Sequence, residues 1–437
     1  MADRPRVGQR LDRAVEQGQQ WAERGARELG GRLRARLRPD SGSGGGSAGG
    51  GGSSGGSGGG RPDAERAAAA AADPAAYFGR EQLRAAEALG HANILVTGQT
   101  GVGKSTLINA IFGQRLAEES IGRPVTKHVQ RHDAPGVPVT IYDTPGVELG
   151  DSQDEVIREL KKTIRASQKG GAGDLIHVLW YCIDAGQTRV QTYDTEIVRA
   201  LAQDMPVILV FTQVIDDARA NALERVVAED ALPIVDGRPV RTLALARTVG
   251  DATIEPRGLE ELIRLTHRIL PEAVRRAFTN AQGLVISLKV DDARLIVAGS
   301  TAVAAGIGAA PIPVPDAWLL LPVQLGMLAG ITASFGIDMS TDSTTKLVRG
   351  LVGSGGVSAV GRTMAGTLLK VVPGGGFITG GVAAGLTAAL GEAHIQLCSE
   401  LLRRQAAGQP MPDSEMLTFL LADYRRRFKR VAGSRAR

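Results

Sequence analysis

Residues 98–105 read Gly98-Gln99-Thr100-Gly101-Val102-Gly103-Lys104-Ser105, which fits the phosphate-binding pattern G-x-x-x-x-G-K-S. An apolar run suited to a buried strand precedes it, residues 93–97, and a run suited to a helix follows, residues 107–112. Glycines let backbone N–H groups wrap phosphate oxygens, and a helix N-terminus adds a positive dipole. Among the 57 glycines of this chain a chance glycine-rich turn is possible, but the Lys-Ser pair, the strand and the helix argue against it. The stretch therefore predicts binding of a nucleoside triphosphate.

The pattern also predicts what individual residues of the loop do. Lys104 would reach the β- and γ-phosphates, and the hydroxyl of Ser105 would ligate Mg²⁺. The residues expected to contact the nucleotide in this segment are Gly98, Gln99, Thr100, Gly101, Val102, Gly103, Lys104, Ser105 and Thr106.

Two further motifs lie downstream in a fixed order. Arg123-Pro124-Val125-Thr126-Lys127 comes first, and Asp143-Thr144-Pro145-Gly146 then ends a second apolar strand, residues 137–142. An aspartate at that point can hold Mg²⁺ through a water, and the Gly146 amide can sense the γ-phosphate. The order and chemistry of the motifs indicate a site for a metal-bound triphosphate.

With these motifs, residues 90–270 resemble the translation-factor-related P-loop GTPases, in particular the Era-like branch with its ribosome-associated and interferon-inducible relatives. The resemblance implies that Thr126 closes on Mg²⁺ and the γ-phosphate as the switch I threonine. It makes Ser105, Thr126 and Asp143 the expected metal site, and it assigns Lys104, Thr126 and Gly146 to GTP hydrolysis.

The base-reading motif departs from the family pattern, which is Asn/Thr-Lys-x-Asp after an apolar strand. Here the strand, residues 206–211, leads into Thr212-Gln213-Val214-Ile215-Asp216-Asp217, so that Gln replaces Lys and the first Asp comes one residue late. Asp216 reaches guanine if the loop bulges by one residue. Asp217 is a second candidate, and both acids as solvated loop residues are the third interpretation. A later strand, residues 240–246, ends where a backbone amide would contact the base, near Ala246, and the motifs together predict GTP and GDP as ligands.

Catalysis is expected to be slow. Many GTPases carry a water-orienting Gln directly after this Asp-x-x-Gly, whereas this chain has Val147, which cannot hydrogen-bond to water. Some relatives bind a potassium ion through an Asn of the P-loop, and Gly101 occupies that position here. Hydrolysis would therefore need another group, a partner or self-association.

Composition divides the 437 residues into parts of different character. The sequence predicts a doubly wound α/β P-loop NTPase sheet, then an all-α, Gly/Ala-rich helical domain, with a flexible N-terminal tail. The expected divisions are a basic amphipathic tail (1–40), a Gly/Ser linker (41–60), leading helices (61–90), the P-loop domain (91–270), the helical domain (271–400) and a basic C-terminal tail (401–437). Residues 1–40 carry a net charge of +4 and residues 401–437 of +6, and the part between them of −5. A basic amphipathic tail can lie on an anionic membrane or dock on a partner, and a partly disordered tail explains it equally well.

Two cysteines, Cys182 and Cys398, argue against a disulfide framework, and no CxxC or His/Cys cluster indicates zinc. The charged N-terminus has no apolar core of a secretory signal, so we expect a cytoplasmic protein. Abundant Ala, Gly and Arg with 4% aromatic residues suggest a bacterial source.

The C-terminal third contains three uncharged runs, residues 295–310, 317–337 and 371–390. The last two have about the length that crosses a bilayer, although Pro373-Gly374-Gly375-Gly376 would break a helix. A tightly packed helical domain explains the same runs. Residues 311–337, with Pro-x-Pro-x-x-Asp before an apolar helix, resemble a bacterial domain of unknown function that accompanies Era-like GTPases. That likeness covers about residues 290–400 and implies an all-α, often membrane-associated appendage without activity of its own.

Two functions then compete. In the first, the chain is a GTPase switch whose nucleotide state changes the contact of the helical domain with a membrane or with another copy of the chain. The protein would then be peripheral or integral at the cytoplasmic membrane. In the second, the chain is a ribosome- or RNA-associated assembly GTPase that contacts phosphates through its basic stretch, residues 425–430. The alternative interpretation of that stretch is a solvated basic terminus. No recognisable RNA-binding module accompanies that stretch, so the first function is favoured.

Overall fold

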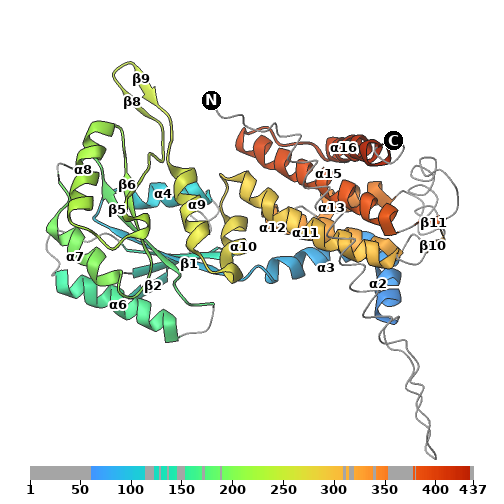
Figure 1. Cartoon of the computed structure of the whole chain (residues 1–437), viewed down its shortest axis with the longest axis horizontal. Coiled ribbons are helices and arrows are strands. Elements are labelled where there is room, and N and C mark those ends of the chain that lie inside the picture. The colour runs from blue at the N-terminus through green and yellow to red at the C-terminus, as the bar shows by residue number, and fades with distance from the viewer. Residues whose placement is uncertain are drawn as a thin grey trace, which may run out of the picture. The chain divides into compact units, whose positions relative to one another are not determined.

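In the computed structural model, the strand predicted ahead of the phosphate-binding loop, β1 (Ala92–Gly98), is the central strand of a seven-stranded sheet (Figure 1). The structure describes residues 61–113, 123–126, 129–134, 137–144, 153–169, 173–187, 189–308, 312–313, 319–337, 341–352, 377–378 and 380–433. The predicted tail and linker (1–60) lie outside these residues, as do Gly146, Val147 and the Pro-Gly stretch 373–376.

The chain forms two compact units. The first, here called the sheet unit, comprises residues 86–289 and 334–336. The second, the helical unit, comprises residues up to 85 together with 290–333 and 337–437.

The sheet of the first unit is largely parallel. Its strand order is β2-β3-β4-β1-β5-β6-β7, in which β4, β1, β5, β6 and β7 pair in parallel and β2–β3 is an antiparallel pair at one edge. These strands are β2 (Arg123–Thr126), β3 (Val129–His132), β4 (Val139–Asp143), β5 (Val178–Asp184), β6 (Val207–Thr212) and β7 (Val240–Arg241). All seven residues of β1 are buried, as expected for a parallel strand covered on both faces.

Helices cover both faces of this sheet, because successive side chains of a strand point to opposite sides. On one face Ile94 and Val96 of β1 pack with α4 (Lys104–Phe112), α9 (Leu259–Ile269) and α10 (Glu272–Ala281). On the other face Leu95 packs with α6 (Gln153–Lys169), α7 (Thr192–Leu201) and α8 (Asp217–Glu229). Two cores on the two faces of one sheet confirm the predicted doubly wound fold.

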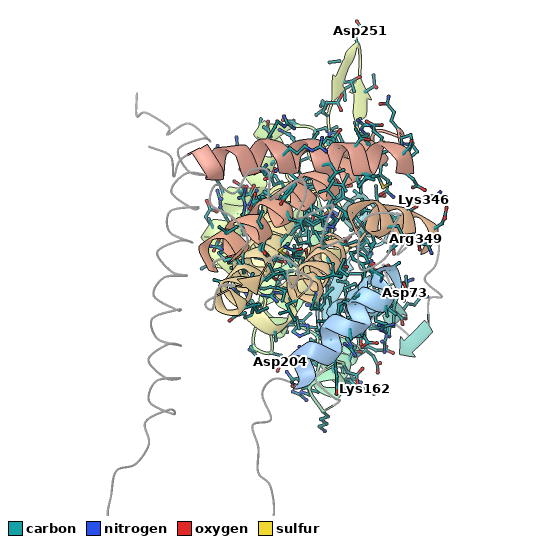
Figure 2. All side chains as sticks on the ribbon, turned by 90° about the vertical axis from the view of Figure 1, so that its right-hand side faces the viewer. Asp73, Lys162, Asp204, Asp251, Lys346 and Arg349 are labelled. Atoms are coloured by element: carbon teal, nitrogen blue, oxygen red, sulfur yellow. The ribbon has the colours of Figure 1, made fainter. Side chains whose placement is uncertain are left out.

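The sheet differs from the sequence prediction at its far edge. The predicted strand 240–246 pairs only through Val240 and Arg241, after which the chain makes a single bridge between Leu243 and Arg257. Between those two residues lies a hairpin, β8 (Arg247–Val249) and β9 (Ala252–Ile254), whose side chains are mostly exposed. Asp251 marks its tip, projecting from the sheet unit (Figure 2).

The helical unit is built around α12 (Leu321–Phe335), which has almost no polar side. Every residue from Met327 to Ala333 is buried, and its neighbours are α11 (Ile286–Ile307) and α15 (Gly380–Ala406): Ile296 lies beside Gly330, and Met327 lies beside Gly391. A helix that is apolar all round belongs inside a core. Burial within the unit therefore accounts for the uncharged stretch from Met327 to Ala333. Among the helices of the described residues, none has both the length and the hydropathy needed to cross a membrane.

In the part of the chain that the structure describes, the helical unit contains six further elements. They are α2 (Arg61–Ala72), α3 (Pro74–Glu87, whose last two residues belong to the sheet unit), α13 (Thr341–Val352), α16 (Asp413–Gly433) and the two-residue strands β10 (Ile312–Pro313) and β11 (Phe377–Ile378). Inside the unit, the Thr332 hydroxyl and His394 Nε2 lie 2.8 Å apart, which joins α12 to α15. Burial lowers the pKa of His394 to about 4, so the histidine is neutral at physiological pH.

Candidate nucleotide-binding site

The phosphate-binding loop connects the end of β1 to the first turn of α4, as predicted. Three glycines in it adopt positive φ: Gly98 (+140°), Gly101 (+81°) and Gly103 (+92°). At Gly98 a side chain is excluded, because a Cβ would lie 2.2 Å from the carbonyl oxygen of Cys182 on the neighbouring strand β5. The sequence therefore needs glycine here both for backbone conformation and for strand packing.

Lys104 is the buried cation of this loop. Its Nζ donates hydrogen bonds to the carbonyl oxygens of Gly98 (3.1 Å) and Gln99 (3.0 Å). Burial lowers the pKa of Lys104, and the charge of Asp143 opposes that shift. Among the residues that the structure describes, the ammonium thus has carbonyl hydrogen-bond partners and no carboxylate partner, and phosphate oxygens would compete for it.

Asp143 ends β4 and lies opposite Val96 of β1 in the sheet register. Burial raises the pKa of this carboxyl, while the charges of Lys104 and His132 oppose the shift. Within the described part of the chain, its buried Oδ1 has no hydrogen-bond partner. An orphaned carboxylate oxygen next to a phosphate-binding loop, with the exposed Ser105 at the start of α4, is the oxygen-donor chemistry that Mg²⁺ requires.

The side chain of Thr126 and the whole of Gly146, two residues predicted for catalysis and switching, lie outside the described part of the structure. Thr126 lies in β2, but its side chain is outside the described residues, as are Gly146 and the neighbouring Val147. Their assigned roles remain predictions.

In the loop predicted to read the base, Thr212 and Gln213 connect the end of β6 to the phosphate-binding loop. The Thr212 hydroxyl hydrogen-bonds to the carbonyl oxygens of Val102 and Ile183. Gln213 has a left-handed backbone (φ +56°), and its Nε2 donates to the Gly101 carbonyl at 3.3 Å and to Asp184 Oδ2 at 3.2 Å. Gln213 is thus the residue of this loop with a left-handed backbone, and the one-residue bulge that would bring Asp216 to guanine stays a prediction.

The two candidate acids differ in what they contact. Asp217 forms a two-point ion pair with Arg257, at 3.0 and 2.9 Å, and this hydrogen bonding lowers its pKa. Asp216 is exposed and caps α8, its Oδ1 accepting from the amides of Ala218 (2.9 Å) and Arg219 (3.3 Å). Asp217 is held by an arginine, which leaves Asp216 as the better candidate for guanine.

Two contacts of the site escaped sequence reasoning. Gln99 Nε2 lies 3.4 Å from both carboxylate oxygens of Asp194, a residue only 1% exposed that also accepts a hydrogen bond from the Tyr181 hydroxyl at 2.8 Å. In the sequence Asp194 is recognisable only as an acidic residue in the first turn of α7. The other contact joins Arg247 Nη2 to Gln213 Oε1 at 3.3 Å.

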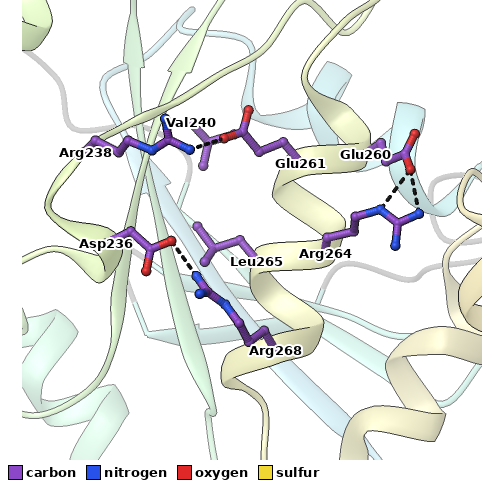
Figure 3. Close-up of a pocket in the computed structure, with 8 residues that line it drawn as sticks. All are labelled: Asp236, Arg238, Val240, Glu260, Glu261, Arg264, Leu265 and Arg268. Carbon is purple, nitrogen blue, oxygen red and sulfur yellow. Dashed lines mark hydrogen bonds and ion pairs between the residues drawn. The ribbon is translucent and has the colours of Figure 1, made fainter. Parts of the chain in front are cut away.

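A separate hollow of about 450 Å³ lies between the η1 turn (Val235–Gly237), β7 and α9 (Figure 3). Its three arginines are each paired with an acid: Arg238 with Glu261, Arg264 with Glu260, and Arg268 with Asp236. With its charges matched in this way, the hollow does not offer the unpaired cation that a phosphate needs.

Two parts of the chain match known protein families. Residues 93–213 match the family described as "50S ribosome-binding GTPase", and residues 275–421 match the "Domain of unknown function (DUF697)". The chain is 40% identical over 86 residues to "Translocase of chloroplast 90, chloroplastic" of Arabidopsis thaliana, covering 19% of this chain and 11% of the relative.

Two bacterial relatives match over longer stretches. "tRNA modification GTPase MnmE" of Janthinobacterium sp. (strain Marseille) is 30% identical over 138 residues, 30% of this chain and 28% of the relative. "GTPase Era" of Geotalea uraniireducens (strain Rf4) is 27% identical over 188 residues, 41% of this chain and 55% of the relative. The chain thus spans about half the length of these curated relatives, or less.

Proposed function

We infer that this chain, an Era-like P-loop GTPase with a C-terminal DUF697 domain, is a Mg²⁺-dependent GTP-binding switch that hydrolyses GTP slowly. Two observations carry the proposal: Lys104 is held on the phosphate-binding loop by carbonyl oxygens, and the buried Oδ1 of Asp143 has no hydrogen-bond partner among the described residues. A triphosphate with its metal supplies what each group lacks: anionic oxygens for Lys104 and a cation for Asp143.

Each residue of the site has a proposed part. Ser105, Asp143 and Thr126 would hold Mg²⁺, which when bound neutralises charge on the β- and γ-phosphates. The amides of the phosphate-binding loop bind the phosphate oxygens, and Gly146 senses the γ-phosphate. Asp216 and the amide near Ala246 read the guanine edge, supported by Thr212 and Gln213.

Slow hydrolysis follows from the residue at position 147. Valine has no hydrogen-bonding group to orient a water, and Gly101 has no side chain to bind a potassium ion. We expect turnover by the chain alone on the order of 10⁻⁴–10⁻² s⁻¹, as for small GTPases without a partner. A long-lived GTP state is the property that a switch requires.

We propose that the nucleotide state of the GTPase domain changes how the helical domain contacts an anionic membrane surface. On α11, the apolar side chains of Leu295 and Val303 are 60% and 53% exposed. Such residues favour a peripheral contact in the interfacial layer. The alternative partner is the ribosome or RNA, which is favoured by the exposed Arg425 and Arg426 of α16 and by the name of the family that residues 93–213 match.

Binding of a fluorescent GDP to the full-length protein tests the nucleotide proposal. We expect GTP and GDP to displace the probe when Mg²⁺ is present and ATP to compete far less. Lys104→Ala should weaken binding by roughly 1.5–3 kcal/mol, because one charge-assisted contact is lost while the amide cradle remains. Equal competition by ATP would remove the guanine assignment and leave a P-loop NTPase of another specificity.

A further inference from the structure

Asp194, in the first turn of α7, is an acid whose capping role does not require it to be buried. Its side chain is 1% exposed, and burial raises the pKa of its carboxyl. It accepts from the Gln191 amide at 3.4 Å, as the acid of a capping box does, but such an acid serves its helix equally well at the surface. Among the described contacts, no lysine or arginine pairs with it. A carboxylate taken out of water in this way must be stabilised by the hydrogen bonds that it accepts, so its donors indicate what it does.

The other two donors come from β5 and from the phosphate-binding loop. The Tyr181 hydroxyl donates to Oδ1 at 2.8 Å, and Gln99 Nε2 lies 3.4 Å from both Oδ1 and Oδ2. Tyr181 and α7 already belong to one hydrophobic core, so the first contact joins parts that pack together without it. Gln99 is different, because the nearby Gly98 and Gly101 give its loop backbone freedom. Asp194 therefore anchors a side chain whose own backbone neighbours do not fix it.

Gln99 connects this anchor to the cation of the site. Its side chain contacts Asp194, while its main-chain carbonyl oxygen accepts a hydrogen bond from Lys104 Nζ at 3.0 Å. The carbonyl oxygen of Gly98 accepts a second bond from the same ammonium at 3.1 Å. Because an ammonium has three N–H donors, these two bonds leave the third for a phosphate oxygen and restrict its direction. That direction thus depends on where Gln99 is held.

We propose that Asp194 is a positioning residue of the nucleotide site: it holds the Gln99 side chain, and through the Gln99 carbonyl it directs the Lys104 ammonium toward the β- and γ-phosphates. The proposal rests on the GTP-binding function proposed above. In this role Asp194 acts through Gln99 and does not touch the nucleotide. It contributes to affinity for the phosphates and leaves the preference for guanine over adenine unchanged.

Titration of full-length variants with fluorescent GDP in Mg²⁺ tests this role, and the thermal midpoint of each variant shows whether it folds. Gln99→Leu keeps the main-chain carbonyl and removes the donor to Asp194, so it should weaken GDP binding by about 2- to 10-fold, the range of one hydrogen bond. Asp194→Ala should weaken binding by a similar factor. The double variant should bind no worse than the weaker single variant, because both changes break the same contact. Asp204→Ala, which removes a half-buried carboxylate beyond the other end of α7, should leave binding unchanged.

A Lys104→Ala background distinguishes positioning from a general loosening of the loop. A loop that Gln99→Leu merely loosens would bind GDP less tightly whether or not residue 104 is lysine. If Gln99 acts through the ammonium, Gln99→Leu should have no further effect in protein that already carries Lys104→Ala.

The outcomes separate this inference from the function on which it rests. Wild-type protein that binds no GDP would overturn both. If wild type binds GDP and Lys104→Ala weakens that binding, but Gln99→Leu binds as wild type does, only the positioning role is wrong. Equal losses from Gln99→Leu in the wild-type and Lys104→Ala backgrounds, or additive losses from Gln99→Leu and Asp194→Ala, would also overturn it and leave Asp194 as the cap of α7. Should Asp194→Ala fail to fold, the two backgrounds of Gln99→Leu still decide.

Discussion

At the scale of single residues, the candidate site buries two groups that can carry opposite charges, Lys104 and Asp143. Among the described contacts they form no ion pair with each other. Burial lowers the pKa of Lys104 and raises that of Asp143, so in the nucleotide-free protein each environment disfavours the charged form. The attraction between the two groups opposes both shifts without cancelling them. Sites in which charged groups are poorly satisfied in the free protein are typical of ligand binding, because the ligand completes their interactions.

Asp143→Asn is therefore expected to stabilise the nucleotide-free protein at neutral pH. The ordinary pKa of the carboxyl is 3.8, and the folded value lies above it. As the pH rises past 3.8 the unfolded chain loses the proton first, so stability falls until the folded group also ionises, and the loss persists at pH 7. Thermal unfolding should show a midpoint a few degrees higher for the variant at pH 7, and a smaller difference as the pH is lowered, whereas Mg²⁺-dependent GTP binding is lost.

Asp251→Asn is the matched control for this change. Asp251 is exposed at the hairpin tip, so its variant should match wild type in both midpoint and GTP binding. A midpoint at pH 7 below that of wild type for Asp143→Asn would show that the carboxylate stabilises the empty site, contrary to the argument from burial.

At the scale of elements, the sequence predicts structures formed by neighbouring residues, but not the side-chain contacts between segments far apart in the chain. The strand, glycine loop and helix around Lys104 follow from neighbouring residues, because each conformation is dictated locally. The contacts of Gln99 with Asp194 and of Gln213 with Arg247 join residues 95 and 34 positions apart, and nothing local signals them. The run 317–337 was ambiguous because hydropathy shows that side chains avoid water, not whether lipid or protein replaces it. In the structure, the neighbours of α12 are α11 and α15.

Close packing of α15 on α11 and α12 makes glycine necessary at one helical position and dispensable at another. A Cβ at Gly391 would lie 2.6 Å from Val297 Cγ2 and 3.0 Å from Met327 Sδ, whereas a Cβ at Gly306 meets nothing within 4 Å. Gly306→Ala should stabilise the protein by about 0.5–1 kcal/mol through helix propensity. Gly391→Ala should destabilise it by about 1–2 kcal/mol net, because overpacking outweighs the same gain.

Thermal midpoints of the two full-length variants check this prediction, since the chemical change is identical and only the surroundings differ. Shifts of the same sign and size would mean that α15 does not approach α11 and α12 as closely as the structure shows.

At the scale of the whole molecule, the polypeptide does not divide at one point between its two units. The chain passes from one unit to the other within α3, within α11 and twice around the end of α12. Helices α11 and α12 thus contribute residues to both units.

The partner of the switch can be identified by sedimenting full-length protein with anionic vesicles or with ribosomes, in GDP and in a non-hydrolysable GTP analogue. We expect binding to phosphatidylserine-containing vesicles that is stronger in the GTP-analogue state, and GTP turnover that rises when such vesicles are present. Two exposed apolar residues of α11 carry the proposed contact, so Leu295→Ser with Val303→Ser should reduce binding, whereas Val249→Ser should not. The electrostatic part should weaken with salt, because the screening length falls from about 10 Å at 0.1 M to about 3 Å at 1 M. Salt-sensitive binding to ribosomes in place of vesicles would establish the alternative function. Binding to neither, in either nucleotide state, would contradict both partners and leave self-association as the route by which hydrolysis is accelerated.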